Sequence, residues 1–208
     1  AAQITTGVPG VIARLCSYVL TDMLIAAEDL AAAEPICAAA LARSRDAGDL
    51  WNQVALLAML VTLDLEAGRI QDATAHLREA LQLDTRTGDW NETGNALDRC
   101  GLLCAATGRF AEAVTVWAAH AALMRHPETP EWPLDVRRQQ GPLGQARQAL
   151  EPDRARAAEE RGAAMTMATA AEYALLLTAP GPPQPAAQGP GKLSARECEL
   201  VTLVARGR

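Results

Sequence analysis

Cys100 and Cys104 are the residues whose types and spacing come closest to a chemical site. They lie four residues apart, so a helix would place both thiols on one face, and His76 or His120 could complete a set of soft metal ligands. The single Cys-x-x-x-Cys spacing lacks the two cysteine pairs of a structural zinc site. Because cysteine also behaves as a small buried hydrophobe, we expect both residues to lie in the core and predict no metal site.

The chain contains no motif of a nucleophile elbow, a phosphate-binding loop, a dinucleotide-binding turn or a zinc-protease helix. Its three histidines, His76, His120 and His126, stand at unrelated positions of the repeat that organises the sequence. They therefore predict neither a catalytic triad nor a pH switch. We predict that the chain is not an enzyme and has no catalytic or cofactor-binding residues.

Two tryptophans are the remaining candidates for a binding site. Trp51 and Trp90 each follow a Gly-Asp pair closely, at the start of an expected helix. They could line a groove for a peptide or an aromatic ligand, because an indole offers a large rigid surface with one polar group. Packing between helical units is the alternative for both.

The elements that would position these residues recur with a period of forty. When the sequence is shifted by forty residues, Gly48-Asp49 falls on Gly88-Asp89 and Gly68-Arg69 falls on Gly108-Arg109. Apolar positions coincide as well, namely Leu57 with Leu97, Leu60 with Cys100, Leu63 with Leu103, Ala73 with Ala113 and Leu77 with Trp117. An earlier unit shows the same face at Leu30, Ala33, Cys37, Ala40 and Leu41. Three units are therefore visible, and Trp117 is interpreted as a core residue.

Each unit is expected to be a helix, a glycine-containing turn and a second helix. In the second unit the first helix runs from Trp51 to about Glu66, and Gly68 ends it in a left-handed conformation. The second helix runs from Gln71 to about Asp84. Its apolar face is formed by Ala73, Leu77, Ala80 and Leu81. A single hairpin cannot bury both of its faces, so we expect the units to stack as a solenoid.

The third unit resembles the tetratricopeptide pattern. Gly101 stands at the small-residue position of the first helix, Phe110 at the turn, and Ala113 and Trp117 on the second helix. The period of forty exceeds the usual period of about 34 residues. We expect an all-α, tetratricopeptide-like solenoid over residues 1–177; another antiparallel helical array is the alternative.

Composition agrees with an all-α protein. Of the 208 residues, 50% are hydrophobic but only 3% are aromatic, which suits closely packed helices better than a β-sandwich. The formal net charge of −6 disfavours direct DNA binding by the helical region. The five cysteines form no paired disulfide framework, and the sequence shows neither a signal peptide nor an apolar run that could span a bilayer. We therefore expect a cytoplasmic protein with no membrane partner.

The pattern weakens after His126. Prolines punctuate the chain, and Gly141-Pro142 is expected to interrupt any helix that begins near Leu134. Residues 143–177 are expected to form further helices that close the array. Five prolines and three glycines between residues 178 and 191 predict that 178–192 is an extended linker.

The last sixteen residues, 193–208, predict the start of one more helix. Ser194 and Glu197 are spaced as a capping box. An apolar face continues along the helix with Leu200, Leu203 and Val204. The string Leu-Ser-x-Arg-Glu-x-Glu-Leu-x-x-Leu-x-Ala-x-Gly, from Leu193 to Gly207, resembles the first helix of the LuxR-type DNA-binding domain. A capping box by itself is common, so an unrelated terminal helix is the alternative.

The resemblance implies a helix-turn-helix whose recognition helix would lie beyond Arg208, so residues 1–208 would contain no DNA-reading residue. The residues that would start the motif are Leu193, Ser194, Arg196, Glu197 and Leu200. DNA would be a partner only through the missing remainder of the motif. Tetratricopeptide-like units with Gly-Asp between them also resemble the region before this domain in large MalT-like regulators of the LuxR type. In those regulators an ATPase domain lies upstream, so ATP would be a cofactor of a domain outside this chain.

Residues 143–177 resemble the helices that close the repeat region in the same regulators. Glu151 stands where that pattern usually has a glycine, and Thr166 lacks the acidic residue that would complete its capping box. We predict part of a LuxR-type transcription regulator with a repeat domain at 1–177, a linker at 178–192 and the first helix of the DNA-binding domain at 193–208. The repeats would bind a protein or small-molecule effector. The alternative is a tetratricopeptide-like interaction scaffold without DNA-binding output.

Overall fold

A computed structural model describes residues 8–88, 90–124 and 133–179 of the chain. The chain divides into two units, Ala1–Thr178 and Ala179–Arg208. The predicted terminal helix at 193–208 lies outside the described residues, as does the predicted linker beyond Ala179. Thr178 was predicted to be the first linker residue, but it is buried and ends the last described helix, since its hydroxyl donates to the Ala174 carbonyl over 3.2 Å.

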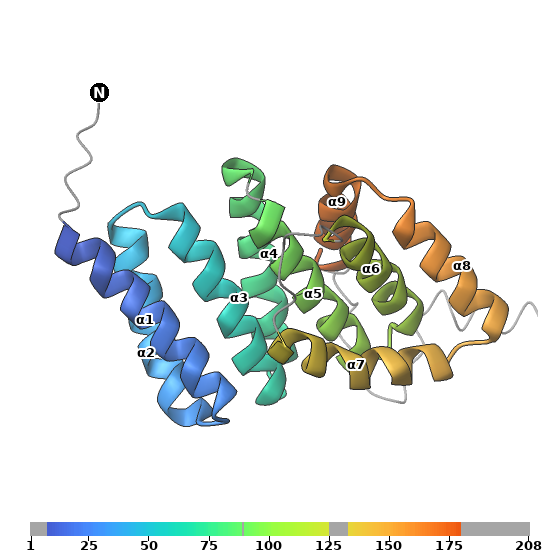
Figure 1. The fold of residues 1–208 in the computed structure, drawn as a ribbon, viewed down its shortest axis with the longest axis horizontal. Coiled ribbons are helices and arrows are strands. Elements are labelled where there is room, and N and C mark those ends of the chain that lie inside the picture. The colour runs from blue at the N-terminus through green and yellow to red at the C-terminus, as the bar shows by residue number, and fades with distance from the viewer. Residues whose placement is uncertain (1–7, 89, 125–132, 180–208) are drawn as a thin grey trace, which may run out of the picture. The chain divides into compact units, whose positions relative to one another are not determined.

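The described residues form helices and no strands, which confirms the all-α prediction (Figure 1). The nine helices in this part of the chain are α1 (Val8–Ala26), α2 (Leu30–Asp46), α3 (Leu50–Glu66), α4 (Ile70–Thr87), α5 (Trp90–Ala106), α6 (Phe110–Leu123), α7 (Pro133–Gln148), α8 (Pro152–Ala163) and α9 (Met167–Leu177). From α1 to α6, each helix packs against the next one in the chain. Short connections after α1, α2, α3, α4 and α5 make these neighbours antiparallel.

The turns between these helices recur every twenty residues. Gly48, Gly68, Gly88 and Gly108 have φ angles between 65° and 72°, and Glu28 occupies the corresponding place with a φ of 60°. The predicted left-handed conformation of Gly68 is therefore confirmed. In this turn the Arg69 N–H donates to the Asp64 carbonyl over 2.8 Å and the Gly68 N–H donates to the Leu65 carbonyl over 3.1 Å. These two bonds satisfy carbonyl groups at the end of α3 and reverse the chain into α4.

The residues that precede the helices differ in whether they cap them. Asp29 and Asp49 cap α2 and α3 by accepting hydrogen bonds from the N–H groups of Ala32 and Asn52, each over 3.2 Å. Arg69 and Arg109 occupy the corresponding place before α4 and α6 and make no side-chain cap. Asp29 therefore departs from the forty-residue register, in which Arg69 and Arg109 stand at the corresponding place.

The core follows the predicted apolar faces. Ala73, Leu77, Ala80 and Leu81 of α4 are all buried. Leu60 and Cys100, which coincide in the forty-residue register, are both buried as well. One apolar cluster joins α1, α2 and α3 with Ala80 of α4, and a second joins residues of α3 to α9. Because α3 contributes to both clusters, nearly all of its side chains are buried.

The tightest helix contact in the third unit involves Gly101 of α5 and Trp117 of α6. Trp117 is buried, as predicted, and its indole N–H donates to Asp98 Oδ1 over 3.0 Å. A Cβ atom at Gly101 would lie 2.5 Å from the indole ring. Only glycine therefore leaves room for the ring, which explains the small residue at this position.

The predicted interruption at Gly141-Pro142 is wrong, because α7 continues through both residues. Proline removes one N–H donor from a helix, but its fixed φ is compatible with helical geometry. Pro142 lines an apolar pocket together with Leu65, Leu102 and Phe110, so contacts with other helices support the segment. Tertiary packing thus overrides the local helix-breaking tendency.

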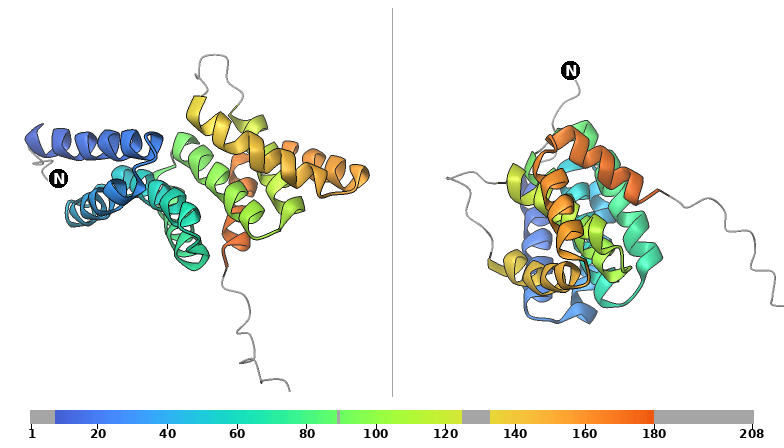
Figure 2. Two further views of the ribbon diagram at one scale, coloured as in Figure 1. Left: turned by 90° about the horizontal axis from the view of Figure 1, so that it is seen from below. Right: turned by 90° about the vertical axis from the view of Figure 1, so that its right-hand side faces the viewer.

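The final helices pack onto α5 and α6. Figure 2 shows α8 running beside α6, and α9 contacts α5. A Cβ atom at Gly162 of α8 would lie 2.0 Å from the Thr115 carbonyl oxygen of α6, so the two backbones approach closely. Thr166 caps α9 by accepting from the Thr169 N–H over 3.2 Å. The threonine cap thus forms without the acidic partner of a capping box.

Candidate functional site

An apolar pocket of about 360 Å³ lies where α3, α5 and α7 meet the start of α6. Its lining residues are Thr62, Leu65, Glu66, Leu102, Ala105, Ala106, Phe110, Pro142 and Gln145. The volume lies within the range of about 300 to 1,000 Å³ that is typical of small-molecule sites. Each helix contributes residues from one end only, so the pocket forms only when all four elements are assembled.

The polar groups of the pocket are few. Thr62 is buried, and its hydroxyl donates to the Ala58 carbonyl of the same helix over 3.4 Å. Glu66 of α3 and Gln145 of α7 also line the pocket and are exposed. The apolar wall is formed by Leu65, Leu102, Phe110 and Pro142. Such a surface can bind an apolar group and orient it with one carboxylate and one amide.

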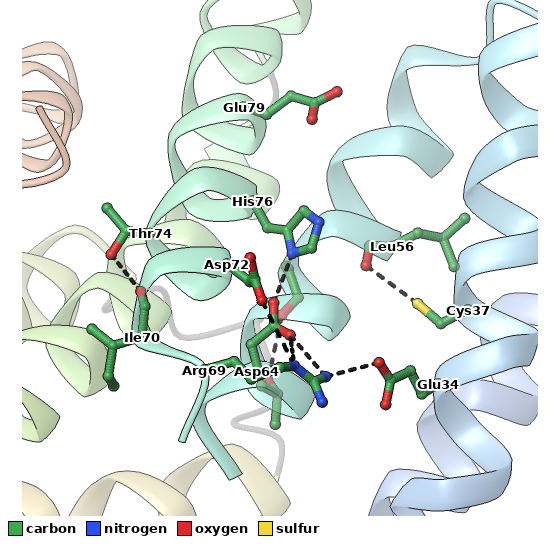
Figure 3. Close-up of polar contacts among 12 residues, drawn as sticks. Glu34, Cys37, Leu56, Asp64, Arg69, Ile70, Asp72, Thr74, His76 and Glu79 are labelled. Atoms are coloured by element: carbon green, nitrogen blue, oxygen red, sulfur yellow. Dashed lines mark hydrogen bonds and ion pairs between the residues drawn. The ribbon is translucent and has the colours of Figure 1, made fainter. Parts of the chain in front are cut away.

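An ionic cluster around the buried carboxylate of Asp64 lies beside α3 and joins three helices. Asp64 of α3 has a side chain that is only 4% exposed. Its Oδ1 accepts from Arg69 Nε over 2.9 Å, and its Oδ2 lies 2.7 Å from Nδ1 of His76 on α4. Arg69 reaches across to Glu34 of α2 over 2.9 Å (Figure 3). The hydrogen bond that Arg69 donates to Asp64 is the main reason that the pKa of Arg69 is raised above its usual value.

The Asp64–His76 pair has the arrangement of a carboxylate that orients an imidazole. Cys37 lies on the same side of α3, but its thiol donates to the Leu56 carbonyl over 3.4 Å (Figure 3). Burial, reinforced by the negative charge of Asp64, raises the pKa of Cys37 to about 12. A thiol that stays protonated is a poor nucleophile. The cluster is therefore suited to fixing α2, α3 and α4 against one another.

A second group of buried carboxylates begins twenty residues further along the chain, at Asp84. Asp84 of α4 accepts hydrogen bonds from the hydroxyl groups of Thr93 on α5 and Thr87. Asp98 of α5 accepts from Trp117 and pairs with Arg99 over 2.5 Å. These contacts join α4, α5 and α6 in the way that the Asp64 contacts join α2, α3 and α4.

Sequence reasoning missed these clusters, although a signal for them exists. Ser44, Asp64, Asp84 and Cys104 each stand four residues before a turn glycine, and all four are buried. A polar residue at a recurrent core position needs a partner, because an unpaired buried polar group is unfavourable. Aligning the chain at intervals of twenty residues would have identified the position.

The predicted site residues differ in where they lie in the structure. Trp51 is 39% exposed, and its ring centroid lies 5.9 Å from that of Tyr18 on α1. It does not line the pocket, and the side chain of Trp90 lies outside the described part. A groove formed by Trp51 and Trp90 therefore stays a prediction. The helix-turn-helix start at 193–208 also lies outside the described residues.

Cys100 and Cys104 occupy core positions, as expected. Cys37, Cys100 and Cys104 are buried free thiols, and Cys16 is an exposed free thiol. The hydrogen bond between Cys100 and Cys104, together with burial, raises the pKa of Cys100 well above its usual value. His76 belongs to the Asp64 cluster, and within the described residues no three potential metal ligands come together.

Comparison of the chain with protein-family models, with curated proteins and with solved structures finds no match. Within residues 8–88, 90–124 and 133–179, no helix combines the length and the hydropathy that a bilayer crossing requires.

Proposed function

We propose that this chain is part of a LuxR-type transcription regulator, in which helical repeats bind an effector and a helix-turn-helix that starts at Leu193 binds operator DNA. The observation that carries the proposal is the motif from Leu193 to Gly207, which follows the all-helical unit in the sequence after a stretch rich in proline and glycine. Because the chain as a whole carries a net charge of −6, which disfavours a broad DNA-binding surface, we propose DNA binding for that motif alone. No catalytic role is part of the proposal.

We further propose that α1–α2, α3–α4 and α5–α6 are three tetratricopeptide-like repeats stacked in series. Support comes from the turns, which recur every twenty residues with the same left-handed conformation. Support also comes from register, because Leu77 and Trp117 are equivalent by a shift of forty and both are buried. Helices α7, α8 and α9 would then close the array at its end.

The effector would bind in the pocket between α3, α5 and α7. The lining favours a ligand with an apolar group and a cationic or hydrogen-bonding end that can reach Glu66. Either a small molecule or the side chain of a partner protein fits this description. Binding there would bridge three helices that belong to different hairpins, so ligand binding would alter how the hairpins pack against one another.

The DNA-binding proposal is tested with the natural full-length protein and DNA fragments selected from a random pool. We expect selection of a short symmetric sequence and a loss of binding in Leu200→Asp, because a charge on the apolar face prevents the first helix from packing. Leu176→Asp is the matched control, since Leu176 is 72% exposed on α9. If the full-length protein selects no sequence, or if both variants bind equally well, the proposal fails.

The effector site is tested by filling the pocket. Ala106→Phe places a ring in the pocket at the last residue of α5, whereas Ala163→Phe places one at the exposed end of α8. We expect a library of small apolar amines and amides to raise the melting temperature of the unmodified chain and of Ala163→Phe, but not that of Ala106→Phe. If the scaffold alternative holds, pocket variants lose a protein partner while the full-length protein selects no DNA.

A further inference from the structure

The pocket between α3, α5 and α7 lies where α5 carries small residues at positions that are large in α3. A shift of forty residues moves Leu65 and Glu66 of α3 onto Ala105 and Ala106 of α5. All four residues line the pocket. Because a methyl group occupies less space than the side chain of leucine or glutamate, α5 leaves room at this level, and α7 borders the same space. The pocket therefore coincides with a local departure from the forty-residue register.

The charge of the pocket is negative. Among the described residues that line it, Glu66 alone is charged, and Glu66 makes no ion pair within the described part of the chain. The arginines in the two adjoining turns are bound elsewhere. Arg69 pairs with Asp64 over 2.9 Å. Arg109 Nη1 donates to the Leu177 carbonyl over 2.9 Å. Neither arginine therefore neutralises the carboxylate of Glu66.

Two helix ends add to the negative potential. α3 ends at Glu66 and α5 ends at Ala106, and both of these residues line the pocket. The carbonyl end of a helix carries a partial negative charge equivalent to about half an elementary charge. The start of α6 also borders the pocket at Phe110, but Glu112 in the first turn of α6 offsets the positive end of that helix. The pocket is therefore suited to a cation and unsuited to an anion.

The uncharged residues of the pocket define the rest of the ligand. The Thr62 hydroxyl donates its proton to the Ala58 carbonyl over 3.4 Å, so its oxygen can only accept a further hydrogen bond. An ammonium group donates hydrogen bonds and accepts none, which matches this oxygen and the carboxylate of Glu66. Leu65, Leu102 and Phe110 have no polar side-chain atom and match an apolar stem. A small cation without such a stem would leave this wall in contact with water.

We infer that the effector is a small monoamine, in which a protonated ammonium group is attached to a compact apolar stem. The ammonium group binds at Glu66 and at the carbonyl ends of α3 and α5, and the stem lies against Leu65, Leu102 and Phe110. The inference rests on the effector site proposed above and narrows its ligand, because neutral amides, carboxylic acids and zwitterionic amino acids are excluded. A carboxylate on the ligand would be repelled by Glu66 and by both helix ends.

The inference is tested by calorimetric titration of the 208-residue chain with probes of similar size and different charge. The probes are phenethylamine, phenethyl alcohol, hydrocinnamate and phenylalanine, which are cationic, neutral, anionic and zwitterionic at neutral pH. We expect phenethylamine to bind and the alcohol to bind more weakly by about fivefold or more, because only the amine forms a charge-assisted hydrogen bond. Hydrocinnamate and phenylalanine should give no measurable binding. Added salt should weaken the binding of the amine and leave that of the alcohol unchanged.

Glu66→Gln separates the charge of the site from its shape. This variant should bind phenethylamine more weakly by about fivefold or more and should bind the alcohol as before. Glu160→Gln is the matched control, because it changes the net charge equally and Glu160 is an exposed residue of α8 that does not line the pocket. That control should bind phenethylamine as tightly as the unmodified chain does.

Equal affinities for the amine and the alcohol, or unchanged amine binding in Glu66→Gln, would overturn the inference. If Ala106→Phe still abolishes that binding, the pocket remains an effector site and only the class of ligand is wrong. If no probe binds, the inference and the effector site both fail. Nα-acetyl-lysine methylamide carries the same ammonium group as a lysine of a partner protein. Tighter binding of this probe than of phenethylamine would assign the pocket to a protein side chain and overturn the small-molecule inference.

Discussion

Replacing Gly101 by alanine is the sharpest test of how the helices pack. Substitution of a helical glycine by alanine normally stabilises a protein by about 0.5 to 1 kcal/mol. At this position the new Cβ atom would lie 2.5 Å from Cε2 and Nε1 of Trp117. Contacts this short require the ring to move by about 1 Å, since carbon atoms separate to about 3.5 to 4.0 Å at their optimum. The normal gain should therefore be reversed.

The magnitude follows from what holds the ring. Overpacking of a core by one methyl group costs about 1 to 3 kcal/mol. The indole N–H also donates to Asp98, and a lost hydrogen bond to a charged group adds about 1.5 to 3 kcal/mol. Asp98 itself is 4% exposed, so water cannot replace the lost donor without opening the core. After allowing for the helix propensity of alanine, we expect a destabilisation of about 2 to 5 kcal/mol.

The assay is urea unfolding followed by circular dichroism at 222 nm. Gly144→Ala is the matched control, because Gly144 lies inside α7 and no atom stands within 4 Å of the place where its Cβ would be. That control should be unchanged or more stable by up to about 1 kcal/mol. Gly101→Ala is also measured in a Trp117→Leu background, where the cost of the added methyl should fall below about 1 kcal/mol. Equal stabilities of the two alanine variants, or an undiminished cost without the indole, would refute the packing argument.

Three further predictions use the same unfolding measurement. Glu28→Gly should stabilise the chain by about 1 kcal/mol, and Gly68→Ala should destabilise it by about the same amount. Both residues have a positive φ, which favours glycine. Opposite signs would contradict the turn assignment. Cys37 should make the free energy of unfolding fall by about 1.4 kcal/mol per pH unit between pH 9 and 12. The reason is that the thiol of the unfolded chain loses its proton near pH 9, while the thiol of the folded chain keeps it to about pH 12. A slope that persists in Cys37→Ala would count against this assignment. Asp64→Asn should lower the free energy of unfolding by about 1 to 3 kcal/mol. Glu79→Gln, which removes an exposed pair with Arg45, should lower it by less than about 1 kcal/mol. Similar losses in both variants would mean that burial of Asp64 is not decisive.

The hairpins were predictable because they are encoded locally. Gly68 and Gly108 indicate a left-handed turn, and the alanine-rich face of α4 follows helical spacing. The pocket was not predictable, because its walls come from α3, α5, α6 and α7 and depend on where α7 packs. Local rules also failed at Pro142, since they describe a helix in water and α7 is supported by other helices. Trp51 and Trp90 were singled out by residue type and by their place at a helix start, and neither feature determines which side of a helix faces a cavity.

The buried polar position before each turn explains a further property of the array. The backbone carbonyl at this position accepts the bond that closes the turn after Ser44, Asp64 and Cys104. The two carboxylates at this position, Asp64 and Asp84, have different partners in the core. Asp64 requires Arg69 and His76, and Asp84 requires Thr93.

These requirements distinguish interfaces that are otherwise similar. An array with identical apolar interfaces could pair α4 with the wrong first helix, because leucine and alanine faces fit one another in several registers. A buried carboxylate placed against the wrong helix would lose its donors and be strongly destabilised. The polar residues therefore contribute less to the total stability of the array than to the order in which its helices pair.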